Sequence, residues 1–308
     1  AVIDTLGAWY TTAPTVTAPA PGGSGVAATF TSTVSIGANP VVASLTGVLN
    51  KLLGLGIVES AGVSQQNDED WRETFQSERL IPMSGGVRVI DPVSGAVVVR
   101  PVAARQAGIM VGVDHEKGAP FHSAANRPMQ GIVGPSRDIS FILTDDANEA
   151  QELLAANIGV VVRGEMGDDF AIASAGFVSI CTDTAAEDPL WQMYNVRRGR
   201  DFIHLTLLRA LRFYLGRYNI NGHTIQALLN TMKGVLRDLK ADDHILGYRV
   251  NFRTDGNSPE EIRLGHLTIG FMAEEPPVLK RITVESARYR DAIDAMVADL
   301  ASQLNLSS

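Results

Sequence analysis

The sequence predicts an α/β protein in which a mixed sheet is flanked by helices. Three observations lead to this class. Apolar residues recur at helical spacing in several segments, short runs rich in Val and Ile lie between them, and Gly, Pro, Ser and Asn separate the two kinds of segment. With 45% hydrophobic and 19% charged residues among 308, the chain has the composition of an ordinary globular protein with a sizeable core.

The composition along the chain suggests three parts. Residues 11–30 are rich in Thr, Ala, Pro and Gly and carry no charge, which is typical of an extended arm or linker. We therefore expect an extended N-terminal arm over residues 1–38, an α/β core region over 39–190 and a C-terminal domain over 191–308.

The core region begins with a predicted helix. Residues 39–55 place apolar side chains at helical spacing, with Asn39 as a plausible cap and Pro40 in the first turn. Residues 62–80 are polar and show no period, so they are expected to be irregular. The run VRVIDPVSGAVVVRP then predicts two short strands around a turn that begins at Asp91.

A loop is expected from Gly112 to Arg137, followed by a crossover unit. The strand DISFILT, a helix over DANEAQELLAANI capped by Asp145 or Asp146, and the strand IGVVVRG follow one another. A strand, helix and strand of this length predict a parallel crossover with the helix on one face of the sheet. The run FAIASAGFVSI is expected to extend that sheet.

The last third contains three predicted helices and a strand pair. The first helix spans about Asn195 to Tyr214, and the second spans Thr224 to Lys240 with Thr224 as its cap. ILGYRVNF and GHLTIGFM predict two antiparallel strands around the turn-rich TDGNSPEE. The final helix, Glu285 to Leu304, carries an apolar stripe that something must cover.

Charge and cysteine content exclude several classes of protein. The net charge of −8 argues against a nucleic-acid coat, because such proteins usually carry a basic stripe. The run of about 18 apolar residues that a membrane span requires is missing, as is a signal-peptide pattern at the start, so we expect cytoplasmic synthesis and no membrane partner. The single cysteine, Cys181, lies in the apolar run GFVSIC and is expected to be buried.

The charge is divided unevenly along the chain. From Trp191 onward there are 16 Lys and Arg against 13 Asp and Glu, a net +3, and the residues before it carry 10 against 21, a net −11. Such a division lets unlike faces of identical subunits attract one another.

The best candidate for a metal site is the segment DHEKGAPFH, which concentrates Asp114, His115, Glu116 and His122 within nine residues. Its spacing matches no familiar zinc motif, and Gly118 and Pro120 should interrupt a helix there. A polar surface loop is therefore the favoured interpretation, and we assign no metal ligand.

No other motif indicates a catalytic or cofactor site. The segment GLGIVESAG lacks the spacing of a phosphate-binding loop, and neither Ser84 nor Ser136 lies in a Gly-x-Ser-x-Gly turn. We assign no catalytic residue and no cofactor. An α/β small-ligand-binding protein or hydrolase remains the alternative, supported by the crossover unit and the His/Asp segment.

A basic stripe is predicted on the second C-terminal helix. Lys233, Arg237 and Lys240 stand at positions i, i+4 and i+7, beside the apolar face. Two interpretations stay open: a solvated helix face, or an electrostatic contact with an acidic partner protein.

Several motifs, in a fixed order, resemble contractile phage tail sheath proteins. SAANRPMQGIVGPSRDISFIL resembles the family's Asn-Arg-Pro segment, LLAANIGVVVR its Gly-Val strand, and Asn195 to Arg198 its Asn-Val-Arg-Arg motif. The most specific match is LRDLKADDHILGYRVNFRTDGNSPEEIRLGHLTIGFMAEEPPVLKRIT, which is similar to the C-terminal domain of P2-like and Mu-like sheaths. With SERLIPMSGGVRVIDPVSG, the resemblance extends from about residue 40 to the end.

The resemblance implies a structural protein of the virion tail and not an enzyme. Sheath subunits form stacked hexameric rings around a tail tube, exchange strands through their terminal arms, and contract to drive the tube through the host envelope. It implies as partners the neighbouring subunits, the tube protein, the baseplate and the tail terminator, with assembly in the host cytoplasm. It makes Lys233, Arg237 and Lys240 candidates for the tube contact. Because only about 38 residues precede the first matching helix, we expect either an unusually compact subunit or a missing start.

Overall fold

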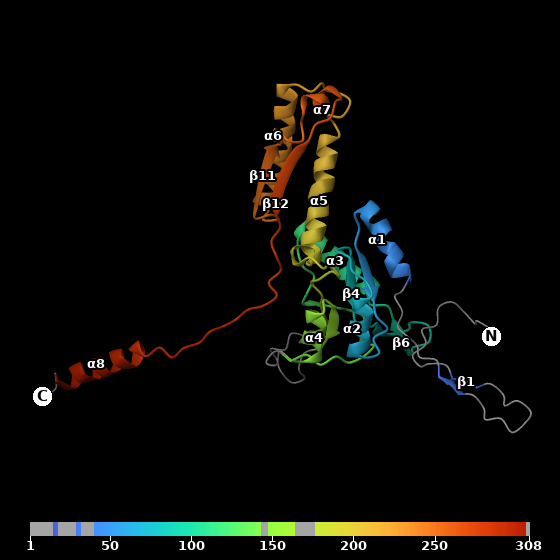
Figure 1. Cartoon of the computed structure of the whole chain (residues 1–308). Helices are drawn as coiled ribbons and strands as arrows, with labels where there is room; N and C mark the ends of the chain where they lie inside the picture. The colour runs from blue at the N-terminus through green and yellow to red at the C-terminus, as the bar shows by residue number, and fades with distance from the viewer. Residues whose placement is uncertain (1–14, 18–28, 32–39, 143–146, 164–175, 306–308) are drawn as a thin grey trace, which may run out of the picture. The chain divides into compact units, whose positions relative to one another are not determined.

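A computed structural model describes residues 15–17, 29–31, 40–142, 147–163 and 176–305 (Figure 1). The chain divides into two compact units, Ala1–Val278 and Leu279–Ser308. Most of the predicted N-terminal arm lies outside the described residues; within it, β1 (Thr15–Thr17) pairs antiparallel with β2 (Thr29–Thr31). The division predicted at residues 38 and 190 stays a prediction.

The mixed helix and sheet class predicted from the sequence is confirmed. The helices of the first unit are α1 (Pro40–Leu52), α2 (Gln65–Glu73), α3 (Ala103–Lys117), α4 (Glu149–Ala155), α5 (Tyr194–Leu211), α6 (Gly222–Ala241) and α7 (Pro259–Arg263). Its further strands are β3 (Gly56–Glu59), β4 (Leu80–Met83), β5 (Val87–Ile90), β6 (Val97–Arg100), β7 (Arg127–Pro128), β8 (Gly134–Pro135), β9 (Val160–Val162), β10 (Val178–Ile180), β11 (Gly247–Phe252) and β12 (Ile269–Glu274). The strands form small sheets of two or three strands.

The parallel crossover lies earlier in the chain than predicted. Strands β3 and β4 pair in parallel and α2 connects them, so the prediction that residues 62–80 are irregular was wrong. The Ser64 side chain caps α2 by accepting a hydrogen bond from the Asn67 amide. Periodicity could not reveal this helix, because its buried side chains are Asp68, Trp71 and Arg72, and two of the three are charged.

The predicted hairpin is confirmed in β5 and β6, which pair antiparallel. The turn begins at Asp91, whose side chain accepts hydrogen bonds from the Val93 amide and the Ser94 hydroxyl. Strand β8 pairs with the other edge of β5 and makes a three-stranded sheet.

Helix α3 occupies part of the expected loop. It continues through Asp114, His115 and Glu116 and ends at Lys117, where Gly118 takes a left-handed conformation with φ of 78°. Its start has no side-chain cap of its own. The Glu59 carboxylate at the end of β3 accepts instead from the Val102 amide at 2.7 Å, and this distant cap explains why the sequence did not show the helix.

The predicted strand over DISFILT was wrong for residues 138–142, which form no strand; residues 143–146 lie outside the described ranges. The cap of α4 is Asn148, which accepts from the Gln151 amide, while Asp145 and Asp146 are not described. Strand β9 pairs antiparallel with β10, so the expected parallel crossover around α4 was also wrong. The VSI part of the next run is β10 and does extend this sheet, in the order β7-β10-β9. Residues 170–175 of that run lie outside the described ranges.

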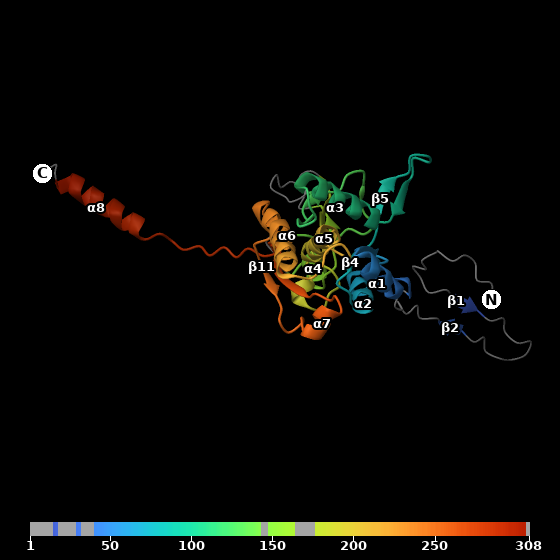
Figure 2. The ribbon, with the colours of Figure 1, turned by 90° about the horizontal axis from the view of Figure 1, so that it is seen from above.

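The C-terminal part of the first unit follows the prediction closely. Helices α5 and α6 lie side by side, and α6 packs against the antiparallel pair β11 and β12 (Figures 1 and 2). The predicted cap of α6 was wrong: Asn221 caps it, accepting from the Thr224 amide, because the helix begins two residues earlier. The turn between the strands contains the short helix α7.

The second unit contains the final predicted helix in a shorter form. Helix α8 spans Asp291–Asn305 and starts six residues after the predicted Glu285. Its apolar stripe is exposed: the first residue of the stripe in this helix, Ile293, is 59% exposed and the last, Leu304, is 69% exposed.

Helix α5 joins two hydrophobic cores of the first unit. Its first residue, Tyr194, is buried with side chains of β4, β5, α3 and Cys181. Further along, Ile203 and Leu207 pack with α6, β11 and Phe121. Cys181 is fully buried, as predicted, and burial raises the pKa of its thiol to about 12.

A buried ion pair fixes α5 against the parallel strands. The Arg79 guanidinium donates to both carboxylate oxygens of Asp201 at 2.6 and 3.1 Å, and the two side chains are 2% and 6% exposed. Arg79 also donates to the Asn50 side chain at 2.6 Å and to the Gly54 carbonyl at 3.3 Å. One side chain therefore links α1, β4 and α5.

We predict that Asp201→Ala lowers the free energy of unfolding by about 3–5 kcal/mol, because it leaves the Arg79 charge buried and unpaired. Denaturant unfolding measures the loss. The control is Asp238→Ala, which removes an exposed ion pair with Arg237 and should cost less than about 1 kcal/mol. Equal losses for the two variants would contradict the role given to the buried pair.

Candidate functional site

The basic stripe predicted on α6 is exposed. Lys233, Arg237 and Lys240 all face solvent, while Met232, Leu236 and Leu239 of the same helix are buried. Arg237 pairs with its neighbour Asp238 at 3.1 Å, and both side chains are at least 70% exposed, so this pair contributes little stability. Asp238, Asp242 and Asp243 are exposed in the same stretch of sequence, so this stretch is mixed in charge rather than purely basic.

A second basic cluster lies where α5 ends, and the sequence reasoning missed it. Arg209, Arg212 and Arg217 line an open hollow together with Phe213 and Leu215. Arg217 stacks over the Phe213 ring at 4.6 Å. The sequence does contain three arginines within nine residues. The apolar residues between them fit the apolar stripe of the predicted helix, so the sequence reasoning did not single out a basic cluster there.

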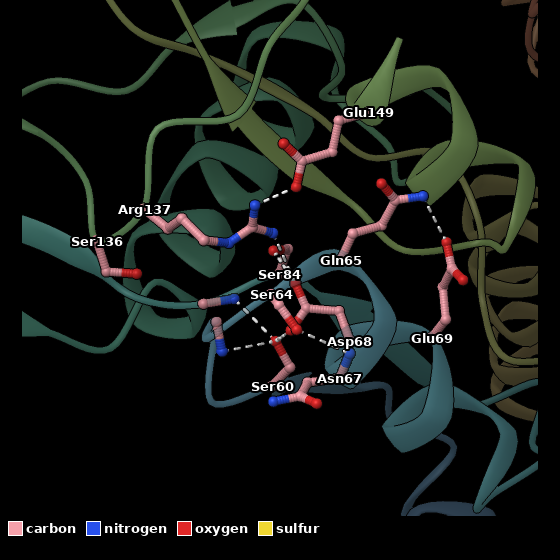
Figure 3. A network of polar contacts seen from close by, with 12 residues as sticks. Ser60, Ser64, Gln65, Asn67, Asp68, Glu69, Ser84, Ser136, Arg137 and Glu149 are labelled. Carbon is pink, nitrogen blue, oxygen red and sulfur yellow. Dashed lines mark hydrogen bonds and ion pairs between the residues drawn. The ribbon is translucent and has the colours of Figure 1, made fainter. Parts of the chain in front are cut away.

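A network of polar side chains surrounds the buried carboxylate of Asp68 (Figure 3). The hydroxyls of Ser60 and Ser84 each donate to it at 2.5 Å, and Arg137 donates at 3.2 Å. Arg137 also pairs with Glu149 at the start of α4. The network thus joins α2, β3, the turn after β4, the segment after β8 and α4.

The Asp68 network does not have the arrangement of a nucleophilic site. Both lone-pair regions of the Ser60 oxygen face donors, since it accepts from the amides of Gly62 and Gly85 at 3.2 and 3.0 Å. The Ser84 hydroxyl donates a hydrogen bond directly to Asp68, with no histidine between them, and Ser136 accepts a hydrogen bond from the Gly86 amide. A serine nucleophile needs a neighbouring base that can take and return its proton, so these serines act as structural links.

The structure separates the residues of the candidate metal segment. The Asp114 carboxylate accepts hydrogen bonds from two guanidinium nitrogens of Arg198. Glu116 accepts one from Arg127, whose hydrogen bond and charge hold the pKa of Glu116 below its usual range. His115 is exposed on α3, and His122 lies beside His244, with ring centroids 5.7 Å apart. Within the described ranges, no group of three or more His, Cys, Asp or Glu side chains could hold a metal ion.

The described helices include none long and apolar enough to cross a membrane.

No family model matches the chain. Two curated relatives do. The chain is 25% identical to a prophage major tail sheath protein of Pseudomonas aeruginosa (strain UCBPP-PA14) over 225 residues, which cover 73% of this chain and 55% of the relative. It is 29% identical to the tail sheath protein of Burkholderia phage BcepMu over 206 residues, which cover 65% of this chain and 40% of the relative. The chain is thus similar in sequence to tail sheath proteins. It spans about half the length of the curated relatives it matches.

Solved structures show that this chain has the sheath fold. The helical sheath of the anti-feeding prophage in its contracted state matches with a TM-score of 0.64 at 19% identity, covering 81% of this chain and 67% of the other. The sheath complex of an extracellular contractile injection system, also contracted, matches with a TM-score of 0.62 at 15% identity, covering 77% and 64%.

The Asn-Val-Arg-Arg motif joins α5 to its surroundings. The Asn195 amide donates to the carbonyls of Phe121 and Pro276, each at 3.1 Å. Arg197 pairs with Glu78 and Asp201, and Arg198 pairs with Asp114 on α3. The motif's polar side chains therefore serve to position elements inside the first unit.

Close packing also fixes the start of α5. A Cβ atom on Gly199 would come within 2.5 Å of the Phe121 ring, so only glycine allows this approach. The next residue, Arg200, donates to both oxygens of Glu275 at 2.7 and 2.8 Å. The end of β12 is thereby held against the helix.

We predict that acid destabilises the protein partly through His122. Burial, followed by the charges of His244 and Lys117, lowers the pKa of His122. The unfolded chain therefore binds a proton more readily than the folded chain, and the stability contributed above about pH 6.5 is lost as the pH falls. His122→Gln should reduce the loss of unfolding free energy between about pH 7.5 and 5.5.

Denaturant unfolding at the two pH values measures the effect of His122→Gln. The exposed His223 on α6 provides the control, because His223→Gln should keep the wild-type dependence. A dependence unchanged by His122→Gln would rule out this residue as a source of acid sensitivity.

Proposed function

We propose that the chain is a structural subunit of a contractile tail sheath and not an enzyme. Copies of the chain stack as hexameric rings around a tail tube in the virion tail, and contraction of this sheath drives the tube through the host envelope. Neighbouring subunits, the tube protein, the baseplate and the tail terminator are its partners. The observation that carries this proposal is the similarity to tail sheath proteins over 73% of the chain, supported by the shared fold.

The pair β11 and β12 supports assembly by strand exchange. The two strands form a two-stranded sheet with a regular six-residue register, and α6 packs against it. Each strand has an outer edge whose backbone groups can pair with an added strand. Terminal arms of neighbouring subunits supply these strands in our proposal, which lets main-chain hydrogen bonds hold neighbours together while the arms rotate.

The stripe of Lys233, Arg237 and Lys240 is our proposed contact with the tube. Its three charges are exposed, on a helix fixed from behind by Leu236 and Leu239. Solvated ion pairs are individually weak, which suits a contact that breaks during contraction.

The purified chain should polymerise into rings or tubes, because subunits that exchange strands need no further component to join. Negative-stain microscopy over a range of protein concentrations tests this. A uniform monomer at high concentration, confirmed by analytical ultracentrifugation, would contradict the proposed function.

Reversing the stripe with Lys233→Glu, Arg237→Glu and Lys240→Glu should weaken assembly on the tube and leave tube-free polymers intact. The comparison is co-sedimentation with purified tube. A matched control reverses three exposed charges elsewhere, Lys51→Glu, Arg100→Glu and Lys117→Glu, with the same change in net charge. Equal tube binding by the two triple variants would remove the stripe from the interface.

A further inference from the structure

The hollow at the end of α5, called here the arginine hollow, combines exposed charges with exposed apolar side chains. Its volume is about 500 Å³, and its lining residues are Arg209, Arg212, Phe213, Leu215 and Arg217. Phe213 is 54% exposed and Leu215 is 80% exposed, and Leu215 also lines a neighbouring apolar groove of about 320 Å³. Aromatic and apolar side chains exposed beside arginines are typical of protein contact surfaces.

The three arginines of the hollow lack carboxylate partners in the described part of the chain. The salt bridges of α5 are formed by Arg197, Arg198 and Arg200 near its start, and none involves Arg209, Arg212 or Arg217. Arginines near the end of a helix favour its dipole. That effect does not account for Arg217, which lies six residues beyond the end of α5 at Leu211. The hollow therefore suits an acidic partner.

Helix α2 turns an acidic face outward. The buried side chains of this helix are Asp68, Trp71 and Arg72, and three carboxylates occupy the other side: Glu69, Asp70 and Glu73. Glutamine side chains donate to the first two at 2.9 Å, and in the described ranges none of the three forms a salt bridge. Like charges three and four residues apart destabilise a helix, and Glu73 stands at the end where the dipole disfavours a carboxylate. The acidic face thus costs α2 stability, which indicates a role outside the helix.

The acidic face continues onto the segment after β10. Ala185 of this segment is buried with Trp71 of α2, which places the residues that follow it beside the helix. Glu187 and Asp188 are exposed there, and Leu190 is 79% exposed. The surface therefore presents carboxylates next to an apolar side chain, as the hollow presents arginines next to Phe213 and Leu215.

The acidic face differs from the other long helices of the first unit. Helix α1 contains no Asp or Glu, and every carboxylate of α3, α5 and α6 has an arginine partner: Asp114 with Arg198, Glu116 with Arg127, Asp201 with Arg79 and Asp238 with Arg237. Among these described helices, α2 alone offers a group of exposed carboxylates whose charge is not already balanced. This contrast selects α2 as the surface that the hollow fits.

The two surfaces lie too far apart to meet in one copy. Tyr194, the first residue of α5, is buried with side chains of β4, and Trp71 of α2 packs against Leu80 of the same strand. Arg209 stands about 22 Å further along α5, at about 1.5 Å per residue (Figure 1). The hollow and the acidic face are therefore available only to another molecule.

We propose that the arginine hollow of one copy of this chain docks onto the acidic face of α2 in a second copy. Arg209, Arg212 and Arg217 pair with Glu69, Asp70 and Glu73, while Phe213 and Leu215 contact Leu190. The contact joins unlike surfaces, so a row of docked copies keeps a free hollow at one end and a free acidic face at the other. Such open growth suits stacked subunits, and the choice of a second copy rests in this respect on the proposed function. No strand is exchanged in this contact.

Crosslinking tests the docking, because the single native cysteine is unreactive. Cys181 is fully buried and its pKa is raised to about 12, so introduced cysteines should react alone. A tagged chain with Leu215→Cys is mixed with an untagged chain with Leu190→Cys and treated with a short bismaleimide. We expect a crosslinked pair of one tagged and one untagged chain, whose yield rises with concentration. An untagged partner with Val93→Cys, at a 93% exposed position in the turn between β5 and β6, should give at least about tenfold less.

Charge exchange tests which surfaces meet. Adding Arg209→Glu, Arg212→Glu and Arg217→Glu to the tagged chain should lower the yield about tenfold, and Glu69→Lys, Asp70→Lys and Glu73→Lys in the untagged chain should restore it. A role of the arginines limited to stabilising α5 would not produce this rescue. The matched control places Lys51→Glu, Arg100→Glu and Lys117→Glu in the tagged chain; it has the same change in net charge and should leave the yield unchanged.

Three results would overturn the proposal. The first is equal yield with the Val93→Cys and Leu190→Cys partners, and the second is a reversal of the hollow that has no effect. The third is a loss on reversal of the hollow that the lysines on α2 do not restore, which would assign the hollow to another acidic partner.

The outcome is separable from that of the proposed function. Wild-type tubes without the crosslink refute the docking alone. The crosslink in a chain that forms neither rings nor tubes refutes the sheath assembly and retains the docking.

Discussion

The ion pair between Arg79 and Asp201 is the constraint on which the arrangement of the first unit depends. Its partners are 122 residues apart in sequence, and both are nearly inaccessible to solvent. A buried ion pair contributes little net stability compared with apolar side chains of the same size, yet losing one partner is costly. The pair therefore favours a single placement of α5 against β4, and its bonds to Asn50 and Gly54 extend that placement to α1.

From this anchored position, α5 connects the two cores. Tyr194 lies in one core, Ile203 and Leu207 lie in the other, and the motif from Asn195 to Arg198 links the helix to α3 and to the segment after β12. The subunit is thus held together internally by buried, directional contacts. Its exposed charges on α6 form weak pairs by comparison. Under the proposed function, this contrast lets contacts between subunits change during contraction while each subunit keeps its own fold.

The residues that suggested chemistry have structural partners instead. Ser84 donates to Asp68, Asp114 pairs with Arg198, and Glu116 pairs with Arg127. The surfaces left exposed are of another kind: a mixed-charge stripe on α6, an apolar groove with arginines at the end of α5, and the apolar face of α8. Exposed apolar area next to unpaired charge is characteristic of protein contact surfaces.

The sequence by itself determined the elements in which apolar residues recur at regular spacing: α1, α5, α6, the hairpin of β5 and β6, and the pair β11 and β12. The exposed stripe at Lys233, Arg237 and Lys240 could also be read from spacing. Only the tertiary structure decided the helix α2, which buries Asp68 and Arg72, and the start of α3, which Glu59 caps from another strand. It alone showed the parallel pair of β3 and β4 and the hollow that Arg209 and Arg212 line. The physical reason is common to these features: a buried charge or an open cap is stable only beside its partner, and those partners lie far along the chain, where local periodicity carries no information about them.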